Sequence, residues 1–298
     1  MISRRTLTQG AIALLGSGVI GRSEAVANIG SSTADFSAAM QRIEAASGGR
    51  LGVAFLDTGT GDKLGYRTDE RFAMCSTFKL LAVAAILSRV DKGEEKLDRH
   101  ISYQASEVIS KSPLITAHVG GEGLSLAELC EAALTLSDNT AANLILASLG
   151  GPPGLTDYIR TLGDAVTRLD RNEPALNEAV PGDLRDTTTP RAMAENLRKL
   201  LRGDTLSKSS KERLTGWLVD CKTGGARLRA GLPKDWRIGD KTGTGEHGTA
   251  NDVAIGWPMT GSPPLILSVY LTQATVDAAA CNAALASGAR AAAATTVF

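Results

Sequence analysis

Segments with strand-like patterns lie near both ends of this chain and enclose a long, mostly helical stretch. Alternating apolar and polar residues predict strands over 51–56, 63–66, 237–241, 252–257 and 265–271. Helical spacing covers 32–46, most of about 68–218, and an alanine-rich segment at 278–294. Strands must pair their backbone groups, so those from both ends are expected to share one sheet. We therefore expect an α/β domain formed by residues 28–67 and 219–298, with an all-helical domain, residues 68–218, inserted between its halves.

The first motif with chemical potential is Ser76-x-x-Lys79, near the start of a buried helix that the apolar run 80–87 predicts. Residues three apart share a helical face, which brings the Lys79 amine beside the Ser76 hydroxyl. A serine hydroxyl attacks poorly until a neighbour takes its proton, and a lysine with an ordinary pKa of roughly 10.4 cannot take it. Alone, the motif fits a surface serine with a nearby solvated lysine better than a catalytic pair.

A second motif, Ser137-Asp138-Asn139, lies between the helices predicted over 126–136 and 140–149. A tight turn at this point can aim a hydroxyl and an amide into a cleft. The alternative is an ordinary helix cap, because serine, aspartate and asparagine are the preferred N-cap residues.

Lys-Thr-Gly occurs twice, and the two copies have different settings. Residues 222–224 follow a predicted helix, 211–221, and their glycine is typical of a helix stop. Residues 241–243 instead follow the strand-like run 236–239. A strand edge can pair with an extended ligand while Lys241 and Thr242 hold its carboxylate, so we expect only the second copy to bind substrate.

The segment 163–189 has no sustained periodicity and reads as a long ordered loop, of the kind that is often functional. Arg171 and Asp186 are placed to pair across its neck. Glu173 and Asn177 can then hold a water jointly, with the carboxylate as general base. Taken alone, Glu173 is also compatible with a solvated loop residue.

In this order, Ser76-x-x-Lys79, Ser137-Asp138-Asn139, Glu173-x-x-Leu176-Asn177 and Lys241-Thr242-Gly243 resemble the motif set of the class A serine β-lactamases. The resemblance extends from about Phe36 to the C-terminal helix. It implies an antiparallel five-stranded sheet flanked by N- and C-terminal helices, with the helical domain inserted. It further implies hydrolysis of penicillins and cephalosporins, small-molecule β-lactam substrates, resistance to these drugs, and a catalytic site without metal or cofactor.

The same resemblance implies an acyl-enzyme route. Ser76 attacks the lactam carbonyl, and the backbone N–H groups of Ser76 and Thr244 form the oxyanion hole. Either Lys79, or Glu173 acting through water, takes the proton of Ser76. Ser137 passes a proton to the leaving nitrogen, and the Glu173 carboxylate with its partner Asn177 positions the water that hydrolyses the ester.

Substrate binding is implied for a second group of residues. Lys241-Thr242-Gly243 would hold the substrate along the strand, and Asn139 would bond its side-chain amide. Members of the family also place an arginine near the substrate carboxylate, at a position that is Ala250 here. Arg227 stands where some members carry a substitute arginine, and it is expected to take this role; the alternative is a surface charge beside Arg229.

Several positions depart from the family pattern. Lys111 stands roughly where members often have an aromatic residue beside the cleft, which predicts a more open entrance. The disulfide of the helical domain is not expected, because the partner position of Cys130 is Val83. The bridge typical of class A carbapenemases is not expected either, since Gly245 occupies the partner position of Cys75.

Composition excludes other classes of function. Lysine plus arginine and aspartate plus glutamate number 32 each, so no net charge attracts nucleic acid. The histidines His100, His118 and His247 form neither a zinc motif nor a catalytic triad. We expect a monomer that acts on small molecules.

Residues 1–27 have the pattern of a cleaved signal peptide: a basic start, an apolar stretch at 11–20, and the small residues Ala25 and Ala27 before the expected cleavage site. Ser3-Arg4-Arg5-Thr6-Leu7 predicts the twin-arginine route, with a general secretory signal as the alternative. Both routes lead to the periplasm, without a membrane anchor after processing.

Two other functions share part of this pattern. A penicillin-binding peptidase or transpeptidase has the serine, lysine and strand motifs but lacks the water-activating glutamate. A β-lactam sensor is acylated and stays acylated, and is normally joined to a membrane segment. Glu173 and Asn177 favour the hydrolase.

Overall fold

The computed structural model describes residues 20–61, 63–259 and 261–295 of the 298-residue chain, with side chains described from residue 33 onward. The predicted signal peptide, residues 1–27, therefore falls largely outside the described residues. None of the described helices is both long and apolar enough to cross a membrane.

A single five-stranded antiparallel sheet joins the two ends of the chain, as predicted. Its strands lie in the order β2-β1-β9-β8-β7. Their bounds are Arg50–Asp57 (β1), Lys63–Tyr66 (β2), Arg237–Gly245 (β7), Thr249–Trp257 (β8) and Leu265–Thr272 (β9). The strand expected over 237–241 continues through both glycines to Gly245, because every residue in it pairs with β8, the last of them with Thr249.

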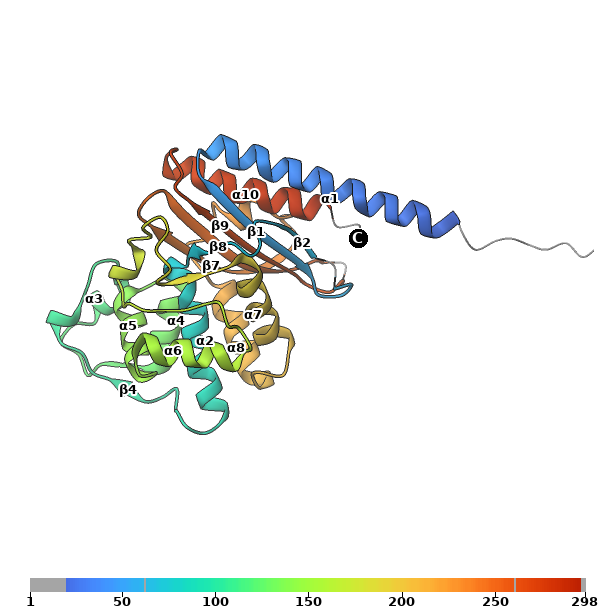
Figure 1. The fold of residues 1–298 in the computed structure, drawn as a ribbon. Coiled ribbons are helices and arrows are strands. Elements are labelled where there is room, and N and C mark those ends of the chain that lie inside the picture. The colour runs from blue at the N-terminus through green and yellow to red at the C-terminus, as the bar shows by residue number, and fades with distance from the viewer. Residues whose placement is uncertain (1–19, 62, 260, 296–298) are drawn as a thin grey trace, which may run out of the picture.

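Two terminal helices cover one face of this sheet, α1 (Ile20–Ser47) and α10 (Ala278–Ala294), and they lie side by side in Figure 1. Phe36, Met40 and Leu285 are buried between these helices and the strands. Asp277 caps α10 by accepting a hydrogen bond from Ala280 N at 2.8 Å. The alanine-rich segment is thus a packed helix, as its pattern predicts.

The short helix α9 (Leu228–Gly231) packs against α10 on the same face, and the other helices lie on the opposite side of the sheet (Figure 1). These other α-helices are α2 (Phe78–Asp91), α3 (Pro113–Ala117), α4 (Leu126–Thr135), α5 (Asn139–Ser148), α6 (Gly151–Thr161), α7 (Pro190–Arg202) and α8 (Lys208–Val219). Three 3₁₀ turns are η1 (Cys75–Thr77), η2 (Ala105–Glu107) and η3 (Ala175–Asn177). Two short pairs, β3 (Phe72–Ala73) with β6 (Thr187–Thr188) and β4 (His100–Ile101) with β5 (Leu124–Ser125), complete the fold.

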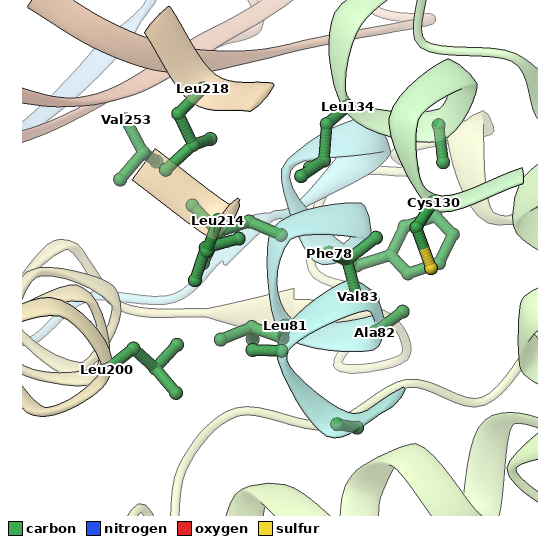
Figure 2. Close-up of a cluster of buried hydrophobic side chains, with 14 of the residues drawn as sticks. Phe78, Leu81, Ala82, Val83, Cys130, Leu134, Leu200, Leu214, Leu218 and Val253 are labelled. Carbon is green, nitrogen blue, oxygen red and sulfur yellow. The ribbon is translucent and has the colours of Figure 1, made fainter. Parts of the chain in front are cut away.

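Helix α2 is the central element of the helical region. Its residues 78–88 are all buried, and it packs against α4, α5, α6 and α8. Figure 2 shows Phe78, Leu81 and Val83 of α2 among side chains of the surrounding elements. Each fully buried side chain of this size contributes about 1.5–3 kcal/mol of transfer free energy. The helix that follows Ser76 is therefore held firmly in place.

All four cysteines of the chain are free and buried: Cys75, Cys130, Cys221 and Cys281. The spacing around Gly245 is tight, since a Cβ added there would lie 2.7 Å from the Cys75 sulfur. Glycine is thus the residue that lets β7 approach η1 so closely.

Candidate active site

Ser76 lies in η1, directly before α2, and its exposed fraction is 8%. Strand β7 packs against this turn, and Gly243 makes the close approach possible, because a Cβ added there would lie 2.7 Å from the Met74 carbonyl oxygen. From β8, the amide of Asn251 donates to the carbonyls of Ala73 and Met74 at 2.9 and 3.1 Å. The turn that carries Ser76 is thereby fastened to the sheet.

The Ser76 hydroxyl and the Lys79 ammonium contact the same oxygen of Glu173. Ser76 Oγ donates to Glu173 Oε1 at 3.1 Å, and Lys79 Nζ lies 3.0 Å from that atom. The Lys79 and Glu173 side chains are completely buried. Burial lowers the pKa of Lys79 from its ordinary value, and the attraction of Glu173 offsets part of this effect. The structure therefore brings a hydroxyl, an amine and a carboxylate together in one buried cluster.

The Ser137 turn contains a helix cap and also contacts Lys79. Asp138 caps α5 by accepting a bond from Ala141 N at 2.9 Å. Ser137 has a positive φ of 59°, and its carbonyl accepts a bond from Lys79 Nζ at 2.8 Å. Asn139 Oδ1 accepts from the same ammonium at 2.7 Å. The turn thus caps a helix and also presents the Ser137 carbonyl and the Asn139 side chain to Lys79.

Ser137 Oγ connects the two parts of the chain. Lys241 Nζ, from β7, donates to it at 3.0 Å, and Lys79 Nζ lies 3.5 Å away. Burial, followed by repulsion from Lys79, lowers the pKa of Lys241 to about 8. The Ser137 hydroxyl is therefore close to two cations that can supply or stabilise a proton in transit.

The loop 163–189 is tied at its neck, as predicted. Arg171 Nε lies 2.6 Å from Asp186 Oδ2. Asp186 Oδ1 also accepts hydrogen bonds from the backbone N–H groups of Asp170 and Arg171. Within the loop, Asn177 Nδ2 donates to Glu173 Oε2. The Asn177 Oδ1 atom is buried and has no partner among the described residues, so it can accept a further hydrogen bond.

Asn143, which the sequence analysis missed, holds the backbone of Glu173. Its Nδ2 donates to the Glu173 carbonyl and its Oδ1 accepts from the Glu173 N–H, both at 2.9 Å. One feature of the sequence could have indicated Asn143. It lies four residues after Asn139 in α5, and residues four apart share a helical face. This pair of bonds links the loop to the helix that follows the Ser137 turn.

Arg227 is buried beneath the end of β7, with an exposed fraction of 9%. Its Nη1 donates to the carbonyls of Gly243 and Asn251, each at 2.7 Å, and its Nη2 donates to Thr244 Oγ1 at 2.7 Å. Nε donates to Asn282 of α10 at 2.8 Å. Burial lowers its pKa from the ordinary value. The guanidinium is therefore not a surface charge, and it reaches the strand beside Thr244, whose register partner on β8 is Ala250.

The two copies of Lys-Thr-Gly differ as expected, with one addition. Only the second copy lies in a strand, β7, whereas Lys222–Gly224 follows the end of α8. The Thr223 hydroxyl of the first copy nevertheless contacts Thr242 Oγ1 at 2.6 Å. The first copy thus contacts the second and helps to orient it. No local sequence pattern indicates this contact.

Lys111, the residue predicted to leave the entrance more open, has a positive φ of 61° and an exposed side chain. Its carbonyl accepts a bond from Asn139 N at 3.0 Å. No three His, Cys, Asp or Glu side chains are grouped as a metal site would need in the part of the chain that the structure describes.

Comparison with known proteins gives a consistent result. The model of the beta-lactamase enzyme family matches residues 35–296. Beta-lactamase OXY-2 of Klebsiella oxytoca is 49% identical over 236 residues, which are 79% of this chain and 81% of that protein. Beta-lactamase CTX-M-97 of Escherichia coli is 48% identical over 234 residues, 78% of this chain and 80% of that protein.

Solved structures agree with these relatives. An ancestral (GNCA) class A beta-lactamase is 59% identical with a TM-score of 0.84, and the match covers 86% of this chain and 98% of that one. The putative class A beta-lactamase PenP from Rhodopseudomonas palustris is 55% identical with a TM-score of 0.86, covering 88% and 99% of the two chains.

Proposed function

The chain belongs to the class A serine β-lactamases, and from that premise we propose that it hydrolyses β-lactams through a Ser76 acyl-enzyme that a Glu173-activated water resolves. The single observation that carries this proposal is the shared contact of Ser76 Oγ and Lys79 Nζ with Glu173 Oε1, at 3.1 and 3.0 Å. A nucleophile and two candidate proton acceptors meet at one atom. The substrates are penicillins and cephalosporins.

In the acylation step, Ser76 Oγ attacks the lactam carbonyl while its proton leaves toward Glu173 or Lys79. The hydrogen bond to Glu173 Oε1 makes the carboxylate one acceptor, directly or through water, and the lowered pKa of Lys79 makes its neutral amine the other. Acylation can therefore proceed through Lys79 when Glu173 is replaced. The backbone N–H groups of Ser76 and Thr244 stabilise the oxyanion. Loss of one such donor costs roughly 10²–10³ in rate in a serine hydrolase.

Opening the ring requires a proton on the leaving nitrogen. Ser137 Oγ donates this proton and is recharged from Lys79 or Lys241, both of which lie within 3.5 Å of it. Protonating the nitrogen prevents the amide bond from forming again, so this proton relay makes formation of the acyl-enzyme irreversible.

Substrate is held along β7. Lys241 and Thr242 bind the carboxylate next to the lactam, and Arg227 adds positive charge from beneath the strand through its bond to Thr244 Oγ1. Gly243 completes the substrate-binding strand segment, and Asn139 bonds the side-chain amide. Asn139 Oδ1 is already held by Lys79, which fixes the direction of its amide group.

In deacylation, a water held by Glu173 and Asn177 attacks the ester. The carboxylate takes a proton from this water, and Asn177 Oδ1, which has no partner among the described residues, accepts a hydrogen bond from it. Export to the periplasm by the twin-arginine route, followed by action as a monomer, completes the proposal.

The test is the variant Glu173→Gln, mixed with a penicillin and followed by intact-protein mass spectrometry. We expect an adduct of the mass of the intact drug to persist on Ser76, whereas the wild type returns to its unmodified mass after consuming the drug. Glu178→Gln is the matched control, because Glu178 lies on the same loop with an exposed side chain. An unmodified Glu173→Gln protein, or one with full turnover, would refute the role of Glu173.

The same measurement separates the hydrolase from its two rivals. A peptidase or a sensor would remain acylated in the wild type, without requiring the Glu173 substitution. Rapid recovery of the wild type therefore distinguishes hydrolysis from trapping.

A further inference from the structure

A cavity lies behind the loop that carries Glu173, separate from the residues assigned to the reaction. Its volume is about 80 Å³. It is lined by the loop segment 179–185, by Arg50 of β1 and Arg71, and by Thr272 and Gln273 at the end of β9. The cavity is thus built from segments far apart in the sequence.

Four arginines line this cavity, and three of them are paired with carboxylates. Arg50 lies 3.0 Å from a carboxylate oxygen of Glu70, Arg171 binds Asp186 and Glu178, and Arg185 binds Asp183. These pairs leave little net charge. They also fix the positions of the three guanidinium groups around the cavity.

Arg71 differs from the other three. Its Nη1 donates to the Val166 carbonyl and to Thr187 Oγ1, each at 2.9 Å, and no carboxylate pairs with it among the residues that the structure describes. A guanidinium has five N–H donors, so Arg71 retains donors and a full positive charge at the cavity. It is half-buried, which strengthens its attraction for an anion relative to a fully solvated arginine.

Two apolar side chains of the cavity lining are exposed to solvent. They are Val180 and Leu184, with exposed fractions of 44% and 58%, among the largest for apolar residues in the described chain. A site lined by one unpaired cation and two exposed apolar side chains matches a ligand with one negative charge and an apolar body.

We propose that this cavity is a binding site for small monocarboxylates that carry an apolar group, with Arg71 as the anchor of the carboxylate. Arg71 binds the carboxylate by charge-assisted hydrogen bonds, while Val180 and Leu184 contact the apolar body. The site adjoins the catalytic loop, since Arg171 lines the cavity two residues before Glu173. The proposal does not depend on the reaction assigned above.

Titration of ¹⁵N-labelled wild-type protein with benzoate tests this proposal by NMR. We expect the amide signals of Val180, of residues 182–187 and of Gln273 to shift and saturate at millimolar benzoate. Benzamide, which has the same shape without the charge, should bind at least tenfold more weakly. No shift in this set, shifts confined to 241–244, or equal binding of benzamide would overturn the proposal.

Variants provide the second arm of the experiment. Arg71→Gln should weaken benzoate binding at least tenfold, and Lys241→Gln should leave it unchanged, because Lys241 lies in the catalytic site. Leu184→Asp should also weaken binding, whereas the matched control Val119→Asp, at another exposed apolar position, should not. If circular dichroism shows that Arg71→Gln is unfolded, Leu184→Asp decides the question. Wild-type affinity for benzoate in Leu184→Asp would then overturn the proposal.

Discussion

Replacement of Asn143 by alanine tests the link between α5 and the catalytic loop. The side chain makes two hydrogen bonds of 2.9 Å, one to the N–H and one to the carbonyl of Glu173. Glu173 is 4% exposed, so water does not readily replace these bonds. The substitution thus removes two bonds and leaves two buried backbone groups without a partner.

The expected loss of stability follows from these two unsatisfied backbone groups. Leaving a buried donor or acceptor unsatisfied costs about 1–3 kcal/mol, so we expect Asn143→Ala to lower the free energy of unfolding by about 2–4 kcal/mol after partial relaxation. In a protein of this size, 1 kcal/mol corresponds to a shift in Tm of roughly 2–4 °C. The expected decrease in Tm is therefore roughly 4–16 °C.

We expect Asn143→Ala to slow deacylation more than acylation. A displacement of the Glu173 carboxylate by about 1 Å is expected to lower the rate of water attack by about 10²-fold. The nucleophile is held independently by η1, β7 and Asn251, so acylation should fall less. The acyl-enzyme should then accumulate during turnover of a penicillin, and both kcat and KM should decrease.

The assays are thermal unfolding followed by circular dichroism and rapid-quench mass spectrometry of the reacting enzyme. Asn172→Ala is the matched control, because Asn172 is exposed and directly precedes Glu173. The reasoning is refuted if Asn143→Ala melts within 1–2 °C of the wild type, roughly the experimental scatter of a neutral surface substitution. It is also refuted if the variant turns over without an accumulated acyl-enzyme.

Two further predictions concern the cations that we propose bind substrate. Because the pKa of Lys241 is lowered to about 8, the ammonium is charged below that pH and is lost above it, so kcat/KM for carboxylate-bearing penicillins should fall as the pH rises through about 8. A profile of kcat/KM against pH checks this prediction. In Lys241→Arg the decrease should move to higher pH. If it does not move, the decrease belongs to the titration of another group. Arg227→Ala should raise KM or lower kcat/KM, since it removes the guanidinium beside Thr244. The double variant with Ala250→Arg should recover part of the loss, and unchanged kinetics in Arg227→Ala with these substrates would contradict the assignment.

The sheet and the terminal helices could be predicted because their patterns are local. Alternation along 51–56 and 265–271 marks residues that are buried on one or both faces, and these segments pair over their full length in the structure. The boundaries were less accurate where glycine interrupts the pattern. The strand predicted over 237–241 ends before residues 242–245, yet each of these residues pairs with a residue of β8.

The candidate site could be predicted only as a set of motifs. Chemistry restricts which residues can act as nucleophile, proton carrier or anion binder, so Ser76, Lys79 and Glu173 stand out by type and spacing. The supporting residues do not stand out in this way. Asn143, Thr223 and Asn251 are ordinary polar residues in the sequence, and only their contacts with Glu173, Thr242 and the turn before Ser76 reveal what they do.

The sequence by itself therefore determined the family, the order of the elements and the residues able to do the chemistry, because periodicity and residue type are properties of short segments. The tertiary structure decided where those residues meet and in what environment. The lowered pKa of Lys79 and the placement of Arg227 beneath β7 depend on burial and on partners up to about a hundred residues away in the chain. Desolvation and hydrogen-bond geometry are set by packing between distant segments, and no pattern in one segment records them.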